Sequence, residues 1–170
     1  MKSPSLKGLF CFAIICSHQF IDCAVVLFED LKIQRLIFMA TIKRFEDMEI
    51  WRISAKLDVE IFKLTEENKY LVKDFKFKAQ ILGSSGSVMD NIAEGFERGG
   101  NREFIQFLSF SKGSAGELRS QIRRCYNRGY ISEEVHDEFV LKCESISERL
   151  SNFIRYLSRS EYKGQKFKTN

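Results

Sequence analysis

The chain has 170 residues, of which 44% are apolar, 29% charged and 13% aromatic. This composition excludes a disordered or fibrous protein and is typical of a single globular domain. The formal net charge of +4 at pH 7 is too small to identify a nucleic-acid binder by itself. Pro4 is the one proline of the chain, so long uninterrupted helices are permitted after it and an all-β fold is disfavoured.

Residues 1–38 differ in composition from the rest of the chain. Apolar runs cover Leu9–Cys16 and Ile21–Phe28, but both are shorter than the roughly 20 residues that a membrane span requires. No small-residue cleavage site follows the first run. We interpret residues 1–38 as a doubtful leader upstream of a true start at Met39, with an export signal and a genuine extra element as alternatives. The domain is then 39–158, followed by a basic tail at 159–170, and a cytoplasmic location is expected.

The first segment with helical periodicity runs from Phe45 to Leu64. It carries two adjoining apolar stripes with spacings of three and four residues, which predict a helix with a wide buried face. The polar stretch at residues 65–69 is expected to end it. The stripes consist of Trp51, Ala55, Val59 and Phe62, and of Ile50, Ile53, Leu57, Ile61 and Leu64.

The second and third segments share one apolar period. In each, the spacing alternates between four and three residues without a miss, which is typical of a coiled-coil seam and predicts two buried seams. Gly99 and Gly100 separate the segments, and Asn101 is predicted to cap the third helix. The seams are Phe75, Ala79, Leu82, Gly86, Met89, Ala93, Phe96 and Phe104, Leu108, Ser111, Ala115, Leu118, Ile122, Cys125.

A fourth helix is predicted after Gly129, with Ser132 as its N-cap. Four helices joined by short connections predict an all-α, antiparallel up-down-up-down four-helix bundle. Cys125 and Cys143 fall on apolar stripes and no CxxC pair is present, so we expect buried thiols, no metal and no cofactor. The fourth stripe is Phe139, Cys143, Ile146, Leu150, Phe153 and Leu157.

Small residues recur at matching depths in the second and third helices. A glycine inside a helix costs about 1 kcal/mol relative to alanine, so a compensating gain is expected, and close approach of two helices would supply it. The sequence leaves open whether this close packing occurs inside the bundle or against another subunit. The residues are Gly83, Gly86, Ala93, Ser111, Ala115 and Gly116.

Three stretches together carry a family resemblance: Asn91–Phe96 (NIAEGF), Glu103–Leu108 (EFIQFL) and Lys112–Glu117 (KGSAGE). With the opening Phe45–Trp51 and the turn Gly129–Ile131, they resemble the 23S rRNA intervening-sequence protein family over about residues 43–158. This resemblance implies a four-helix bundle in which the shared motif residues have structural or interface roles. Those residues are Trp51, Asn91, Glu94, Gly95, Gly113, Ser114 and Glu117.

The resemblance also implies partners. Members of that family form homopentameric barrels, and a relative is the accessory subunit of diversity-generating retroelements, where it binds nucleic acid and a reverse transcriptase. A homo-oligomer, RNA or DNA, and a reverse transcriptase are therefore the partners it suggests. The chain lacks the basic pair that often follows the position of Gln80 and the proline that often precedes Asn91, and the loss of the basic pair weakens the nucleic-acid expectation.

No catalytic constellation stands out, so we predict a protein that is not an enzyme. His136 is expected in the exposed first turn of the fourth helix, without a chemical role. Glu94 and Glu117 are the best candidates for an acid–base pair, although ordinary helix-surface pairs with Arg98 and Gln121 explain them more simply.

Two adjacent arginine rows near the end of the third helix are the best candidate for polyanion binding, together with the basic tail. Cations at a helix C-terminus followed by an acidic helix start are the simpler explanation. The leading hypothesis is an oligomeric bundle that binds nucleic acid weakly and without sequence specificity, or scaffolds a nucleic-acid enzyme. The alternative is a purely structural interaction module. The candidate residues are Arg119, Arg123, Arg124, Arg128, Lys163, Lys166 and Lys168.

Overall fold

The computed structural model describes residues 42–160 and 163–164. The expectations about a leader at 1–38, a start at Met39 and tail contacts from Lys166 and Lys168 concern residues outside this range. The described residues from Lys43 onward belong to one compact unit.

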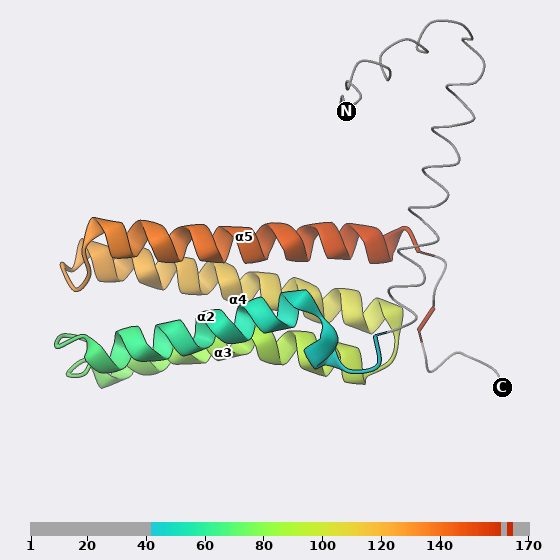
Figure 1. The fold of residues 1–170 in the computed structure, drawn as a ribbon, viewed down its shortest axis with the longest axis horizontal. Helices are drawn as coiled ribbons and strands as arrows, with labels where there is room; N and C mark the ends of the chain where they lie inside the picture. Colours follow the sequence, from blue (N-terminus) through green and yellow to red (C-terminus); the bar gives the residue numbers. More distant parts are fainter. Residues whose placement is uncertain (1–41, 161–162, 165–170) are drawn as a thin grey trace, which may run out of the picture. The chain divides into compact units, whose positions relative to one another are not determined.

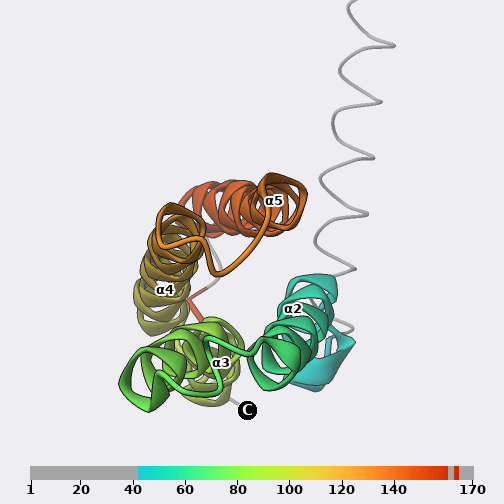
Figure 2. The same ribbon diagram turned by 90° about the vertical axis from the view of Figure 1, so that its left-hand side faces the viewer.

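Four long helices form the bundle. A short 3-10 turn, η1 (Phe45–Asp47), precedes α2 (Glu49–Glu67), α3 (Phe75–Glu97), α4 (Asn101–Asn127) and α5 (Glu133–Ser158). Consecutive helices run in opposite directions (Figure 1), and they follow one another around the bundle in chain order (Figure 2). The predicted all-α, antiparallel up-down-up-down bundle is confirmed for the described residues.

Three of the predicted helix boundaries depend on local chemistry that the sequence displays. The hydroxyl of Ser132 accepts a hydrogen bond from the backbone N–H of Val135, as predicted for the N-cap of α5. Gly99 and Gly129 adopt positive φ angles of 67° and 68° after α3 and α4, a conformation that glycine adopts without a Cβ clash.

The prediction that Asn101 caps α4 is wrong. Gly100 is the N-cap, with no side-chain cap bond, and Asn101 is already helical. Its amide Nδ2 instead donates to the carbonyl oxygen of Leu157 at 3.1 Å. Asn101 therefore ties the start of α4 to the end of α5, because that carbonyl lies in the last turn of α5, where it also accepts from the backbone N–H of Ser160 at 3.1 Å.

The apolar stripes of α4 and α5 pack inside the bundle as predicted. All seven residues of the α4 seam are buried, from Phe104 to Cys125. On α5, Phe153 is half-buried and the other five stripe residues are buried. These two helices therefore contribute the seams that the sequence assigned to them.

The predicted seam of α3 is on the wrong face. Phe75 is 76% exposed, and Ala79 is also exposed. The buried positions are instead Phe77, Ile81, Ser84, Ser85, Val88, Ile92 and Gly95. Both sets have helical spacing, so periodicity alone could not choose between them; the inward set includes two serines, which lowered its apparent hydrophobicity.

One of the two predicted stripes of α2 is also outside the core. Val59 and Phe62 are 52% and 50% exposed. Ser54 and Thr65 are buried instead, because their hydroxyls donate to the carbonyl oxygens of Ile50 and Phe62 and so need no other partner. The buried face of α2 is consequently narrower than predicted.

Among the glycines of α3 and α4, Gly95 is the one at which the two helices approach most closely. A Cβ built there would lie 2.5 Å from the Cβ of Phe107 and 3.0 Å from Cδ2 of Phe104. By contrast, a Cβ at Gly83, Gly113 or Gly116 would meet nothing within 4 Å. Ser111 Oγ on α4 also donates to the carbonyl oxygen of Val88 on α3 at 2.6 Å. Within one chain, α3 and α4 therefore approach closely at Gly95 and at Ser111, but not at Gly83, Gly113 or Gly116.

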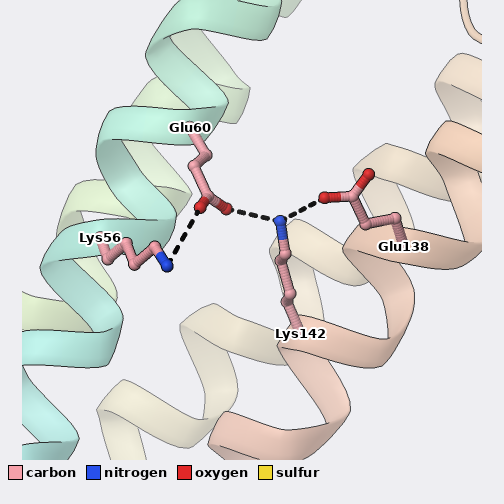
Figure 3. A network of polar contacts seen from close by, with 4 residues as sticks. All are labelled: Lys56, Glu60, Glu138 and Lys142. Atoms are coloured by element: carbon pink, nitrogen blue, oxygen red, sulfur yellow. Dashed lines mark hydrogen bonds and ion pairs between the residues drawn. The ribbon is translucent and has the colours of Figure 1, made fainter.

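The edge between α2 and α5 is bridged by ion pairs. Lys142 Nζ donates to Glu60 Oε2 at 2.6 Å and to Glu138 Oε1 at 2.5 Å, and Lys56 lies 4.0 Å from Glu60 (Figure 3). Burial alone would lower the pKa of Lys142, but the hydrogen bonds to Glu138 and Glu60 outweigh burial and raise it. Closer to the other end of the bundle, Arg149 donates to Glu49 at 3.0 Å.

Candidate nucleic-acid interface

The four candidate arginines divide between two sides of α4. Arg124 and Arg128 are one turn apart and reach toward α3, whereas Arg119 reaches toward α5. The two predicted arginine rows therefore lie on two separate surfaces. One of them is built around an aromatic ring and the other around an acidic partner.

The first surface surrounds Phe77 on α3, whose side chain is buried. The guanidinium of Arg124 lies 4.2 Å from the Phe77 ring centroid and that of Arg128 lies 4.7 Å from it. Arg124 also donates to Gln80 Oε1 at 3.5 Å, and Arg128 to Asp74 Oδ2 at 3.2 Å. Cation–π contact holds both guanidinium groups over the ring while their outer edges remain exposed.

Two lysines that sequence reasoning missed extend this surface. Lys76 is exposed and precedes Gln80 by one helical turn, so it lies on the side of α3 that faces Arg124. Lys73 is exposed directly before α3. Their alternation with Phe75 and Phe77 in the run Lys73–Lys78 was the available signal. We call Arg124, Arg128, Lys73, Lys76 and Phe77 the Phe77 surface.

Aromatic rings flank this end of the bundle. Tyr70 and Tyr130 are stacked with centroids 5.3 Å apart and an interplanar angle of 12°. Lys69 Nζ lies 5.0 Å from the Tyr70 ring, which is 44% exposed. The two loops are joined by a hydrogen bond from Asn68 Nδ2 to the carbonyl oxygen of Tyr130 at 2.6 Å. The loop between α2 and α3 therefore places cationic and aromatic groups next to the turn that follows α4.

The second arginine surface is partly neutralised within the chain. Arg119 forms an ion pair with Glu144 on α5 at 2.9 Å. Arg123 lies 5.9 Å from the ring centroid of Tyr126 on its own helix. This arrangement agrees with the simpler explanation, in which arginines near a helix C-terminus find acidic and aromatic partners close by.

Lys163 lies far from the arginines. Its carbonyl oxygen accepts from the backbone N–H of Asn101 at 2.9 Å, and Gly164 pairs with Gly100 in an antiparallel bridge. This is the start of α4, whereas Arg128 follows its end, about 40 Å away at 1.5 Å per residue. The described part of the tail therefore does not join the Phe77 surface.

The family-motif residues of α3 and α4 make local contacts. Asn91 Nδ2 donates to the carbonyl oxygen of Ser87 at 2.6 Å, and Ser114 Oγ to that of Phe110 at 3.2 Å. Gly113 is exposed. These contacts, together with the crossing point at Gly95, indicate structural roles within the helices.

Trp51, the remaining motif residue, lies where η1 meets α2. Its ring packs edge-on against Phe45 with centroids 5.2 Å apart. The indole Nε1 is buried and has no hydrogen-bond partner among the described residues.

Glu94 and Glu117 are not brought together as an acid–base pair. Glu94 forms an ion pair with Arg98 at 2.5 Å, beside the crossing point at Gly95. Glu117 accepts from Gln121, whose Nε2 also donates to Ser84 Oγ at 2.8 Å. Ser84 precedes Glu94 by ten residues, about 15 Å along a helix. The two carboxylates are thus at different heights, each in an ordinary helix-surface pair.

The expectation that His136 is exposed is wrong, because its side chain is buried against α4. Its Nδ1 lies 2.6 Å from Asp137 Oδ1, and its ring is 5.0 Å from that of Tyr126. Nε2 is buried without a hydrogen-bond partner in the described part of the chain. His136 follows the cap by only four residues, but the first turn of α5 already turns this position inward.

The two described cysteines are free and buried, as predicted. Burial raises the pKa of both the Cys125 and the Cys143 thiol to about 11, which keeps them protonated and unreactive near neutral pH. Within residues 42–160 and 163–164, no group of three or more His, Cys, Asp or Glu side chains is placed to hold a metal ion. None of the described helices is long and apolar enough to cross a membrane.

Comparison with known protein families identifies the family of this chain. The model of the family described as 23S rRNA-intervening sequence protein matches residues 46–152, which is more than half of the chain. The chain belongs to the 23S rRNA-intervening sequence protein family.

A solved structure supports this membership of the intervening-sequence family. It is a protein of unknown function from the S23 ribosomal protein family of Bacteroides thetaiotaomicron, with 25% sequence identity and a TM-score of 0.56. The match covers 62% of this chain and 98% of that one. A search of curated proteins finds no match. The resemblance to the intervening-sequence family inferred from the motifs is thereby confirmed.

Proposed function

We propose that this chain is a non-catalytic, self-associating bundle that binds the phosphate backbone of nucleic acid weakly and without reading its sequence. The observation that carries this proposal is the Phe77 surface, where two arginines are held over one ring with two lysines beside them. A cytoplasmic location is part of the proposal.

The chemistry of this surface suits a flexible single strand. Lysine and arginine side chains neutralise phosphates and release counterions. The exposed Tyr70 ring offers a platform for base stacking that accepts any base. Among the residues that the structure describes, no helix or ribbon projects from this surface to enter a groove, so sequence readout is not expected.

Self-association would make a weak surface useful. Asp74 offsets part of the charge of Arg128, so a single copy offers few free cations. Repeating the surface in one assembly raises avidity without new contacts. A homopentamer, as the family resemblance implies, would present five copies, and the same assembly is the form in which the protein would scaffold a nucleic-acid enzyme such as a reverse transcriptase.

The proposal is tested by fluorescence anisotropy with a labelled single-stranded oligonucleotide and the full chain, over a range of salt concentrations. We expect the double variant Arg124→Ala/Arg128→Ala to bind at least several-fold more weakly. Its slope of log affinity against log salt should become shallower by about one for each phosphate that the variant no longer neutralises.

The matched control is Arg119→Ala/Arg123→Ala, which removes the same charge from the same helix on its other side. Equal weakening in both double variants would point to net charge alone, and unchanged binding in the first would contradict the Phe77 surface. Circular dichroism checks that each variant retains its helices.

A purely structural interaction module is the second candidate. It is favoured by the intrachain pairing of Arg119 with Glu144 and of Arg128 with Asp74, which reduces the charge available to a polyanion. This candidate predicts no salt-dependent binding to the oligonucleotide in the parent chain, with self-association intact.

A further inference from the structure

The outward face of the α2–α3 hairpin is an apolar surface that other described helices touch only at one end, where Phe45 of η1 contacts Trp51 and Phe104 of α4 contacts Phe96. From α2 it includes Val59 and Phe62, each about half exposed, and from α3 it includes Phe75, which is 76% exposed. Most other members are half-buried. We call this surface the hairpin face; it consists of Trp51, Ala55, Val59, Phe62, Phe75, Ala79, Leu82, Gly86, Met89, Ala93 and Phe96.

Contacts between α2 and α3 show that the two stripes border the same seam. Ser85 Oγ donates to Asp58 Oδ1 at 2.5 Å, and Lys78 Nζ donates to Glu66 Oε1 at 2.6 Å. Phe62 is four residues from both Asp58 and Glu66, so it lies on the side of α2 that borders α3.

On α3, Leu82 lies between Lys78 and Ser85 in the same way. A Cβ at Gly86 would come within 3.9 Å of Asp58 Oδ1, which places the glycine beside the same line. The α2 and α3 stripes therefore form one continuous surface on the outside of the hairpin.

The spacing of the α3 part identifies the kind of partner. Seven positions from Phe75 to Phe96 alternate by four and three residues, and such a seam packs by inserting side chains between those of a facing helix. α3 already presents a second buried set to its own bundle. A helix that is apolar on two sides is typical of one buried on both.

Charges along the two borders of the hairpin face are complementary toward the C-terminal end of α3. Arg52, Lys56 and Lys63 are exposed along the outer border of α2, where Lys56 also lies 4.0 Å from Glu60. The outer border of α3 carries Lys76 near its start and the exposed Asp90 and Glu97 toward its end. Among the described residues, Asp90 and Glu97 form no ion pair. When α2 of one copy lies beside α3 of a second copy, the basic side chains on the border of α2 face the acidic side chains Asp90 and Glu97 on the border of α3.

We propose that the hairpin face is the surface through which copies of this chain associate, with the basic border of α2 meeting the acidic border of α3. This inference rests on the self-association in the proposed function and names its surface. Asp90 falls at the height of Arg52 and Lys56, because the contacts Asp58–Ser85 and Glu66–Lys78 fix the pairing of the two helices. Apolar burial supplies the affinity, and the border charges set the orientation.

The first test measures the size of the full chain by sedimentation velocity over a range of concentrations. The parent is expected to assemble, and Phe62→Lys/Leu82→Lys to require at least tenfold higher concentration. Leu141→Lys is the matched control, since Leu141 is 65% exposed on α5 and lies off the hairpin face. A monomeric parent, or equal loss in the control, would overturn the proposal.

The second test uses charge exchange. Asp90→Arg and Arg52→Asp are each expected to weaken assembly, and an equimolar mixture of the two is expected to assemble more strongly than either variant alone, since opposite borders then meet wherever unlike copies are neighbours. Failure of the mixture to recover would reject the border pairing. Both positions are exposed, and circular dichroism confirms that the helices persist.

A third measurement compares the full chain with the chain that begins at Met39. Equal assembly of the two chains supports the proposal that a second copy covers the hairpin face. If only the chain without residues 1–38 assembles, those residues cover the hairpin face in the full chain, and the proposal is rejected. Oligonucleotide binding is measured in parallel: loss of assembly with retained binding shows that the hairpin face fails independently of the Phe77 surface.

Discussion

The seams of α3 and α4 have the same spacing but opposite surroundings. On α4, the positions from Phe104 to Cys125 are all buried inside the bundle. On α3, the matching positions from Phe75 to Phe96 are exposed or half-buried. This difference shows that a heptad pattern predicts a helix surface able to pack. Whether that surface packs inside the bundle depends on the rest of the fold.

The largest expected effect comes from truncating one leucine in each seam. Leu118→Ala on α4 removes a fully buried side chain, so we expect the free energy of unfolding to fall by about 2–5 kcal/mol. Leu82→Ala on α3 should cost less than about 1.5 kcal/mol in the monomer, since Leu82 is only half-buried. Urea unfolding at low protein concentration measures both, and equal losses would contradict the contrast.

Burial of the Cys125 thiol, at the end of the α4 seam, is expected to make the free energy of unfolding depend on pH. Because the pKa of Cys125 is raised to about 11 from an unfolded value near 9, the folded state retains a proton that the unfolded state loses. The free energy of unfolding is therefore unaffected by this thiol below about pH 9. It falls as the pH rises from 9 toward 11, by up to about 2.7 kcal/mol.

Unfolding measured at a series of pH values tests this expectation. Cys143, with the same raised pKa, adds a parallel contribution from α5. In the variant Cys125→Ala/Cys143→Ala, the decline above pH 9 should become shallower. An unchanged slope would show that other groups cause it.

Alanine substitutions at two glycines of α3 compare a position in close contact with α4, Gly95, with a position on the open helix surface, Gly83. Gly95→Ala would place a Cβ 2.5 Å from that of Phe107, and we expect a loss of about 1–3 kcal/mol from overpacking. Gly83→Ala meets nothing within 4 Å and should gain up to about 1 kcal/mol in helix propensity. Thermal unfolding of the two variants against the parent provides the comparison, and a stabilised Gly95→Ala would be incompatible with the close crossing.

The smallest effect is expected at the edge between α2 and α5. Lys142→Met removes the ion pairs to Glu60 and Glu138, which lie partly in solvent. We expect a loss below about 1 kcal/mol that shrinks as salt is added. Unfolding at low and high salt measures it, and a larger, salt-independent loss would mean that this edge depends on packing of the lysine chain instead.

Much of the fold was predictable because helix formation depends on local signals. Residues such as Ser132 and Gly129 mark helix boundaries by their own chemistry, and the α4 stripe is apolar on one side only. The inward side of α3 was missed because Ser84 and Ser85 lie in it. Their hydroxyls donate to backbone carbonyls of α3 itself, and Ser85 also reaches Asp58. Such a serine is satisfied inside the bundle, which spacing cannot reveal.

The candidate site was predictable only in part. Arg124 and Arg128 were identified by their spacing, but their support by Phe77 depends on the pairing of α3 with α4. The burial of His136 likewise depends on Tyr126 of the neighbouring helix. Contacts across helices are set by the rotation of each helix about its axis, and a single sequence does not give that rotation.

The arrangement of helices also bears on the order in which the chain folds. Neighbours in sequence are neighbours around the bundle (Figure 2), so the α3–α4 and α4–α5 hairpins form from short-range contacts and are expected to form rapidly. The α2–α5 edge joins residues as distant as Glu49 and Arg149. Closing that edge requires ordering nearly the whole bundle, which makes docking of α2 against α5 the expected final step on the route to the native state.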